Sequence, residues 1–142
     1  MTDKAKIAAI ADGLSEALDR DIRALSIRQP WCHNILHDGK DVENRDWPTK
    51  GRGWFLIHAG KSTDGQLPKA LANCPRGGIV GAARVVDCVT EWDSKWWHGK
   101  YGFVLKNPIE IPLIPCKGAL GFFRPDQQAV EAVRAYLQEQ SQ

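Results

Sequence analysis

Apolar residues at helical spacing stand at both ends of the chain. Near the start they recur every three or four positions with charged residues between them, which predicts an amphipathic helix; they are Ile7, Ile10, Leu14 and Leu18. Near the end, Asp126 is a favourable N-cap for a second helix. The apolar stripe of that helix consists of Ala129, Val130, Val133, Tyr136 and Leu137.

Between these helices the pattern is mostly that of short strands separated by turn residues. One short helix is expected after the first strand, because Pro30 suits a first helical turn and Gly39 suits a helix end. The expected strands span residues 23–27, 41–45, 54–58, 78–89, 101–106, 109–114 and 118–123, with a short helical stretch at 67–72. Pro108, Pro112 and Pro115 restrict the 109–114 strand to a sheet edge or an irregular ribbon.

This order of elements predicts an α+β fold: a small, partly closed β-barrel of five or six strands, with helices at both ends and after the first strand. No repeat or low-complexity linker interrupts it, so we expect residues 1–142 to form a single domain. The apolar stretches, such as 109–115, are far shorter than the ~20 residues of a membrane span. The first residues lack the apolar segment of a secretory signal. We therefore expect a cytoplasmic protein with no membrane partner.

Composition indicates an ordinary globular chain, with 43% hydrophobic and 25% charged residues. Cys32, Cys74, Cys88 and Cys116 lack the clustered spacing of a zinc site, so we expect reduced packing residues, no metal and no cofactor. One alternative remains open, because His33 and His37 share a helical face beside Cys32 and could hold a metal. Two histidines on a short helix are more often partly exposed polar residues.

Charge adds a weak indication about the partner. The net charge of +2 does not by itself indicate nucleic acid. Residues 23–61, however, carry seven basic and four acidic side chains, so the positive excess lies in the segment with the unusual motifs. A phosphate-facing surface is compatible with this distribution, and so is an ordinary solvated face.

Two segments do not look like scaffold. In residues 26–31 a strand ends in Arg-Gln-Pro-Trp at the start of a helix, and in residues 40–45 charges crowd a short strand. If that strand is extended, Asp41, Glu43 and Arg45 share one face. The long stem of Lys40 can reach over the same surface.

These segments resemble the ASCH domain family, whose signature is G-x-K-x-x-E-x-R. The sequence has K-x-x-E-x-R at Lys40, Glu43 and Arg45, with Gly39 one residue closer to the lysine than in the pattern. Further matches follow in the family's order at residues 24–31, 52–61, 78–88, 101–108 and 117–123. The resemblance covers about residues 23–124 and leaves out the two end helices.

The resemblance implies a PUA-like β-barrel whose K-x-x-E-x-R strand lines a polar cleft for RNA or a nucleoside or nucleotide. Lys40 and Arg45 would meet phosphate or a base carbonyl, and Glu43 would accept from a base N–H. The candidate ligand-binding residues are Arg28, Gln29, Trp31, Lys40, Glu43, Arg45, His58 and Lys61. Trp31 or Trp54 could stack on a base. A purely structural reading is that Glu43 and Arg45 simply pair with each other.

A small hydrolase is the alternative function. One amidase type among ASCH-like proteins removes the acyl group of N4-acylcytidine with a lysine base and a threonine nucleophile three residues later. Lys40 matches that lysine, but Glu43 stands at the threonine position. As catalytic residues, Lys40 and Glu43 would have to activate water, with a pKa shifted toward neutrality by burial.

Two further hypotheses concern other kinds of site. Single-stranded RNA could be cleaved with His33, His37 or His58 as metal ligands, or the N-terminal helix could dock a partner protein. The segment containing Trp92, Trp96 and Trp97 fits either an aromatic loop over the cleft or a short helix buried against the barrel. The sequence leaves turnover and oligomeric state open.

Overall fold

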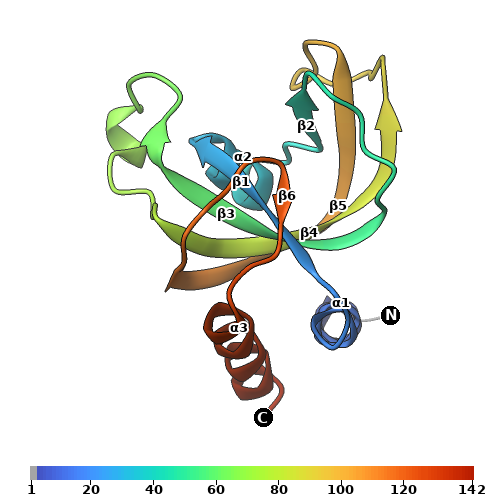
Figure 1. Cartoon of the computed structure of the whole chain (residues 1–142), viewed down its shortest axis with the longest axis vertical. Helices are drawn as coiled ribbons and strands as arrows, with labels where there is room; N and C mark the ends of the chain where they lie inside the picture. Colours follow the sequence, from blue (N-terminus) through green and yellow to red (C-terminus); the bar gives the residue numbers. More distant parts are fainter. Residues whose placement is uncertain (1–2) are drawn as a thin grey trace.

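The structure, a computed structural model, describes residues 3–142 and shows a six-stranded sheet curled around a short helix (Figure 1). In chain order the elements are α1 (Asp3–Leu18), β1 (Arg23–Gln29), α2 (Trp31–His37), β2 (Val42–Arg45), β3 (Gly53–Thr63), the 3-10 turn η1 (Lys69–Leu71), β4 (Gly78–Val89), β5 (Tyr101–Pro115), β6 (Phe122–Phe123) and α3 (Gln127–Gln140). The α+β, partly closed barrel predicted from the sequence is confirmed.

The strand order is β2-β5-β4-β3-β1-β6, with β1 and β3 parallel and the other neighbours antiparallel. The sheet is strongly curled, so β2 comes close to β1 although three strands lie between them in this order. The contact is direct: Arg45 in β2 donates a hydrogen bond to the backbone oxygen of Ser26 in β1. An open seam between β2 and β1 is therefore the gap in the barrel.

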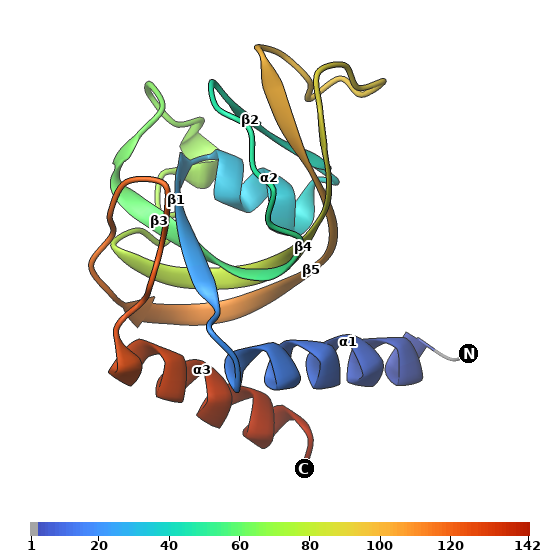
Figure 2. The same ribbon diagram turned by 45° about the vertical axis from the view of Figure 1, so that its right-hand side comes forward.

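Both faces of the sheet are covered, which explains why consecutive residues such as Phe55, Leu56 and Ile57 of β3 are all buried. Along β1 and β3, Leu25, Phe55 and Ile57 face an inner core that includes Cys32 and Ile35 of α2. The alternate positions face an outer core that α1 and α3 complete; its members include Leu14, Leu18, Ala24, Leu56, Ala82, Val133 and Leu137. Figure 2 shows α1 and α3 on one side of the sheet and α2 on its concave side. The period-2 alternation thus separates two cores.

The helices match their sequence signals. Leu14 and Leu18 of α1 are buried, whereas the side chain of Ile7, also expected in that stripe, lies outside the described residues. Asp126 caps α3, because its Oδ1 accepts from the Ala129 N–H at 2.8 Å. No helix within residues 3–142 is long and apolar enough to cross a membrane.

The C-terminal strands differ from the prediction. The expected strands at 101–106 and 109–114 form the single strand β5, and the strand expected at 118–123 shortens to β6. Asn107 adopts a left-handed φ of 57°, and the β4–β5 register shifts nearby, so Pro108 is accommodated without ending the strand. Because β2 pairs only with the Tyr101–Val104 end, the proline-rich half of β5 is an edge, as expected. The helical stretch expected at 67–72 is only η1.

The close approach of β4 and β5 at Gly78 gives a test of the sheet. A Cβ there would lie 2.1 Å from the Ile114 carbonyl oxygen and 2.9 Å from the Pro115 Cα. Both are backbone atoms, so we expect Gly78→Ala to lower the free energy of unfolding by about 1–3 kcal/mol in chemical denaturation. The control is Gly60→Ala in β3, where a Cβ meets nothing within 4 Å. Equal stabilities for the two variants would contradict the close pairing of β4 with β5 at Gly78.

Candidate functional site

A cleft of about 490 Å³ lies at the seam between β1 and β2. Four of the predicted ligand-binding residues line it: Arg28, Trp31, Glu43 and Arg45. The remaining lining residues are Ser26, Ile27, Asn44, Asp46, Trp47, Asp64, His98 and Gly99. Arg28 of β1 and Glu43 and Arg45 of β2 therefore meet at one concavity, whereas Lys40, expected with them, does not line it.

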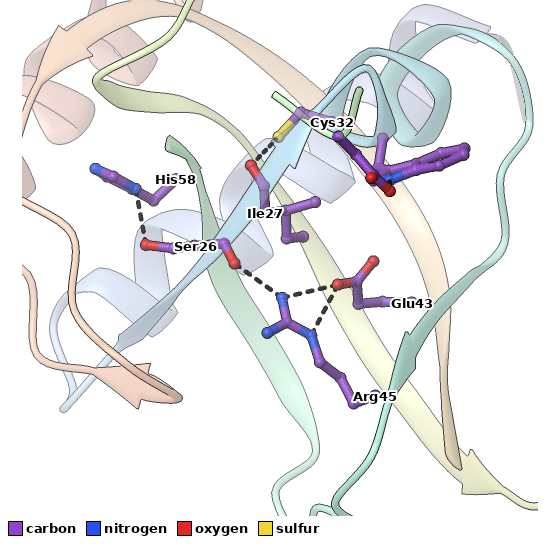
Figure 3. Close-up of polar contacts among 8 residues, drawn as sticks. Ser26, Ile27, Cys32, Glu43, Arg45 and His58 are labelled. Carbon is purple, nitrogen blue, oxygen red and sulfur yellow. Dashed lines mark hydrogen bonds and ion pairs between the residues drawn. The ribbon is translucent and has the colours of Figure 1, made fainter. Parts of the chain in front are cut away.

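An ion pair between Glu43 and Arg45 of β2 lies in this cleft, and a hydrogen bond from Arg45 crosses the seam to β1 (Figure 3). Arg45 Nε donates to Glu43 Oε2 at 2.8 Å, and Arg45 Nη2 lies 2.8 Å from the same oxygen. The same Nη2 also donates to the Ser26 backbone oxygen at 2.8 Å. The guanidinium therefore binds its neighbour on β2 and the facing strand β1 at once. Glu43 and Arg45 do pair with each other, as the structural alternative expected.

The Glu43 carboxylate nevertheless keeps one oxygen available. Glu43 is only 6% exposed, and both Arg45 nitrogens meet Oε2. Within residues 3–142 no group donates a hydrogen bond to Oε1. Every fully buried side-chain oxygen in that range does have a hydrogen-bond partner, so Oε1 is not fully buried. Oε1 must therefore retain solvent contact. Burial raises the pKa of Glu43, and the positive charges of Arg45 and Lys40 oppose that rise.

Lys40 lies beside the cleft, clamped between two tryptophans. Its Nζ is 5.3 Å from the centre of the Trp31 ring and 5.7 Å from that of Trp96, within cation–π range. Lys40 is 5% exposed, and this burial lowers its pKa, while the carboxylates of Glu43 and Asp41 oppose the shift. Trp31 lines the cleft and Lys40 does not, so Lys40 meets the cleft through the Trp31 ring.

Asp41 does not line the cleft with Glu43 and Arg45, with which strand alternation grouped it. It precedes β2, and its carboxylate binds the segment between β4 and β5 instead. Oδ2 accepts from Trp92 Nε1 at 3.1 Å, and Oδ1 accepts from the Ser94 hydroxyl at 2.8 Å. Asp41 therefore anchors the tryptophan-rich segment.

Asn44 holds the other end of that segment. Its Nδ2 donates to the Trp96 carbonyl at 2.9 Å, and its Oδ1 accepts from the His98 N–H at 3.1 Å. The segment is a loop without helix, so the loop alternative is the correct one. It brings His98 and Gly99 into the cleft lining and the Trp96 ring to Lys40.

Gln29 is not available to a ligand in the cleft. It is buried, its Nε2 donates to the Pro75 carbonyl at 2.9 Å, and its Oε1 accepts from the His33 N–H at 3.0 Å. This amide joins the start of α2 to the loop before β4. The sequence could not distinguish that role from ligand binding.

His58 and Lys61 line a separate hollow beside the cleft. The Cys116 carbonyl accepts from His58 Nε2 at 2.7 Å, so the Nδ1 of a neutral ring accepts from the Ser26 hydroxyl at 2.9 Å (Figure 3). Both nitrogens of this buried ring are therefore occupied. The structure divides the predicted ligand-binding residues between two adjacent hollows.

A larger hollow of about 590 Å³ lies on the outer face of the sheet, against α1. Trp54 lines it and packs with the outer core beside Gly13, so it cannot stack on a base in the seam cleft. Two arginines of this hollow are engaged, because Arg84 donates to Asn107 Oδ1 and Arg52 donates to backbone carbonyls; Arg20 also lines it. No residue of the K-x-x-E-x-R motif lines it.

The histidines expected as possible metal ligands have other partners. His37 pairs with Glu110, and His33 Nε2 is 3.7 Å from Asp38 Oδ2. Cys32 is buried and donates to the Ile27 carbonyl at 3.1 Å, and burial raises the pKa of its thiol. Across residues 3–142 no three His, Cys, Asp or Glu side chains gather as a metal site, and the four cysteines are unpaired.

Several cleft residues gave little or no signal in the sequence. Ser26 contributes through its backbone oxygen, which any residue type would supply. Asp64 reaches the cleft from the end of β3 and accepts from Trp31 Nε1 at 2.8 Å, a contact across 33 positions. His98 had a signal, because it follows the cluster of tryptophans that the sequence marked as a potential loop over the cleft.

The raised pKa of Glu43 gives a pH-dependent prediction. The protonated Glu43 side chain stabilises the fold fully at pH values below its ordinary pKa of 4.5. This contribution is lost as pH rises through the raised pKa of the folded state. Because Glu43→Gln does not titrate, we expect the parent to lose stability relative to this variant between pH 4 and neutrality. The difference in the free energy of unfolding between parent and variant should change by about 1.4 kcal/mol for each unit by which the pKa of Glu43 is raised. Denaturant unfolding at several pH values measures it, and a relative gain in stability would mean that Arg45 outweighs burial.

Comparison with known proteins now extends the family resemblance. The sequence matches the model of the ASCH domain over residues 25–137, which reaches into α3 and so further than residue 124. It is 24% identical over 142 aligned positions to activating signal cointegrator 1 of Homo sapiens, covering 82% of this chain and 24% of that protein. The Mus musculus protein of the same name is 22% identical with the same coverage. The chain thus spans about a quarter of the length of these curated relatives. Since the family match includes most of the chain and its K-x-x-E-x-R strand, the protein belongs to the ASCH domain family.

Proposed function

We propose that the seam cleft binds a base of RNA or of a nucleotide. Membership of the ASCH domain family supports a generic RNA-binding role. The single observation that carries the proposal is the free Oε1 of Glu43, an acceptor in a polar cleft of about 490 Å³. An exocyclic amine of a base is a suitable donor to such a carboxylate.

The walls of the cleft suit a planar ligand. Trp31 is oriented by its hydrogen bond to Asp64 and by the Lys40 ammonium over its ring. Trp47 packs edge-on against Phe103 and Phe122, with ring centres 5.2 and 6.0 Å apart. A fixed aromatic face that stacks on a base contributes about 1–3 kcal/mol. In this proposal Lys40 acts by positioning Trp31.

The rim of the cleft carries exposed charges for the rest of a nucleotide. Arg28 is exposed beside the cleft, and His98 approaches from the tryptophan-rich loop. Within the described residues, Arg45 Nη1 makes no hydrogen bond, so one edge of the guanidinium is also available. Arginine donors in this arrangement match a phosphate or a base carbonyl.

Glu43→Gln should change which base is preferred. The N–H groups of Arg45 require an acceptor, so the amide oxygen of Gln will face Arg45 and its NH₂ will take the position of Oε1. The cleft then offers a donor in place of an acceptor. We expect the preference to move from cytosine, which has an amine, to uracil, which has a carbonyl, by about tenfold or more.

Fluorescence anisotropy with short labelled C-rich and U-rich RNAs measures this preference. Glu139→Gln, an exposed carboxylate on α3, is the matched control and should behave like the parent. If Glu43→Gln is folded and keeps the parent's ranking of the two RNAs, Glu43 does not contact the base.

A second candidate function is hydrolysis of an acylated nucleoside, and one observation favours it. Burial lowers the pKa of Lys40 next to Glu43, which brings an amine closer to the range of a general base. Against it, Glu43 stands where that amidase type has threonine, and the Ser26 hydroxyl is bound to His58.

Incubation with N4-acetylcytidine and with single-stranded RNA, followed by chromatography, separates these functions. A binding protein leaves both substrates intact. Release of cytidine that Lys40→Ala abolishes would replace the binding proposal by an amidase, and shortened RNA would indicate a nuclease.

A further inference from the structure

A second hollow of about 390 Å³ adjoins the cleft and has a different charge character. Lys61 and Lys117 line it together with the buried His58, and no acidic side chain among the described residues does. The cleft, in contrast, mixes Arg28 and Arg45 with three carboxylates, those of Glu43, Asp46 and Asp64. The cleft thus offers donors and acceptors, whereas the neighbouring hollow offers positive charge alone.

The two lysines are available to a ligand. Both are exposed, and within residues 3–142 neither forms an ion pair. The stem of Lys61 runs along Gly77, where a Cβ would lie 3.7 Å from Lys61 Cγ and 3.9 Å from Cε. Much of the surface of this hollow is backbone, because the lining residues at 60, 77 and 118 are glycines. An anion can therefore approach both ammonium groups closely.

Ser26 connects the two hollows, because it lines both. Its backbone oxygen is held by Arg45 on the cleft side, and its hydroxyl is bonded to His58 on the other side (Figure 3). β6 pairs with Ala24 and Leu25, and from Ser26 onward no strand among the described residues pairs with β1 on this side. The boundary between the hollows is therefore a single strand, whose Ser26 is bonded to one side chain on each side.

We propose that the ligand is a single-stranded polynucleotide that crosses β1 at Ser26, with a base in the cleft and a neighbouring phosphodiester between Lys61 and Lys117. This inference rests on the proposed base-binding function of the cleft. Base edges are read by paired donors and acceptors, and phosphates are held by positive charge regardless of sequence. The difference in charge between the two hollows matches that division. A free nucleoside would fill only the first of them.

The test compares ligands with and without the phosphodiester. The variant is Lys61→Ala with Lys117→Ala, and the control is Lys50→Ala with Lys106→Ala, two exposed lysines that line neither hollow. Binding of a labelled trinucleotide is followed by anisotropy at several salt concentrations, and binding of cytidine by calorimetry. Each phosphate contact to a single strand contributes about 0.7 to the logarithmic salt slope, so the variant should flatten the slope by about 1.4.

We expect the double variant to weaken trinucleotide binding, to leave cytidine binding unchanged, and to match the parent on a trinucleotide with neutral methylphosphonate linkages. An unchanged salt slope would overturn the phosphate path and leave the base-binding cleft intact. A loss of cytidine binding would overturn it too, because the lysines would then act on the cleft itself. If Glu43→Gln leaves base preference unchanged while the lysine effect persists, the base-binding function fails and the crossing at Ser26 fails with it. RNA and DNA trinucleotides of one sequence show whether a 2′-hydroxyl is also read.

Discussion

The guanidinium of Arg45 is the contact on which both the shape of the barrel and the chemistry of its cleft depend. Among the strands of residues 3–142, β2 pairs with β5 alone, and Arg45 ties it across the seam to Ser26 of β1. The same group neutralises Glu43, whose burial would otherwise leave a carboxylate without a partner. Removing one member of a buried ion pair typically costs about 3–5 kcal/mol. Because Arg45 is partly exposed, we expect the loss of this pair to cost an amount near the lower end of that range.

This bridge explains how one motif can be structural and still serve a ligand. A strand across the seam would satisfy every backbone group but leave no cleft. A side-chain bridge closes the gap at one point and leaves the space beside it open. Because Arg45 directs both of its bonded nitrogens to Oε2 of Glu43, the other carboxylate oxygen is left for a ligand.

The sequence predicted the fold better than it predicted the site. Period-2 and helical spacing reflect burial directly, so the strand–helix order and the apolar stripes followed from the pattern. The continuity of β5 did not, because it depends on a left-handed Asn107 and on register shifts that leave no clear sequence signal.

Within the site, the K-x-x-E-x-R motif predicted a cleft lined by Glu43 and Arg45, and both residues line one cleft. Strand alternation grouped Asp41 with them, but its carboxylate binds Trp92 and Ser94, which lie more than 50 positions away in the chain. His58 was assigned to the same cleft as Arg45, but it lies on the other side of Ser26. The pattern of a single sequence indicates local periodicity. The positions of these side chains depend instead on contacts between segments that are distant in the chain.

The indole N–H signals of the tryptophans test most directly whether the seam cleft is the binding site. Trp31 lines the cleft and Trp54 lines the larger hollow on the opposite face of the sheet, so the two report on competing sites. In a nitrogen–proton correlation spectrum of the labelled protein, titration with a short single-stranded RNA should shift the Trp31 signal and leave that of Trp54 unchanged. Movement of Trp54 with a static Trp31 would contradict binding in the seam cleft and assign it to the outer face.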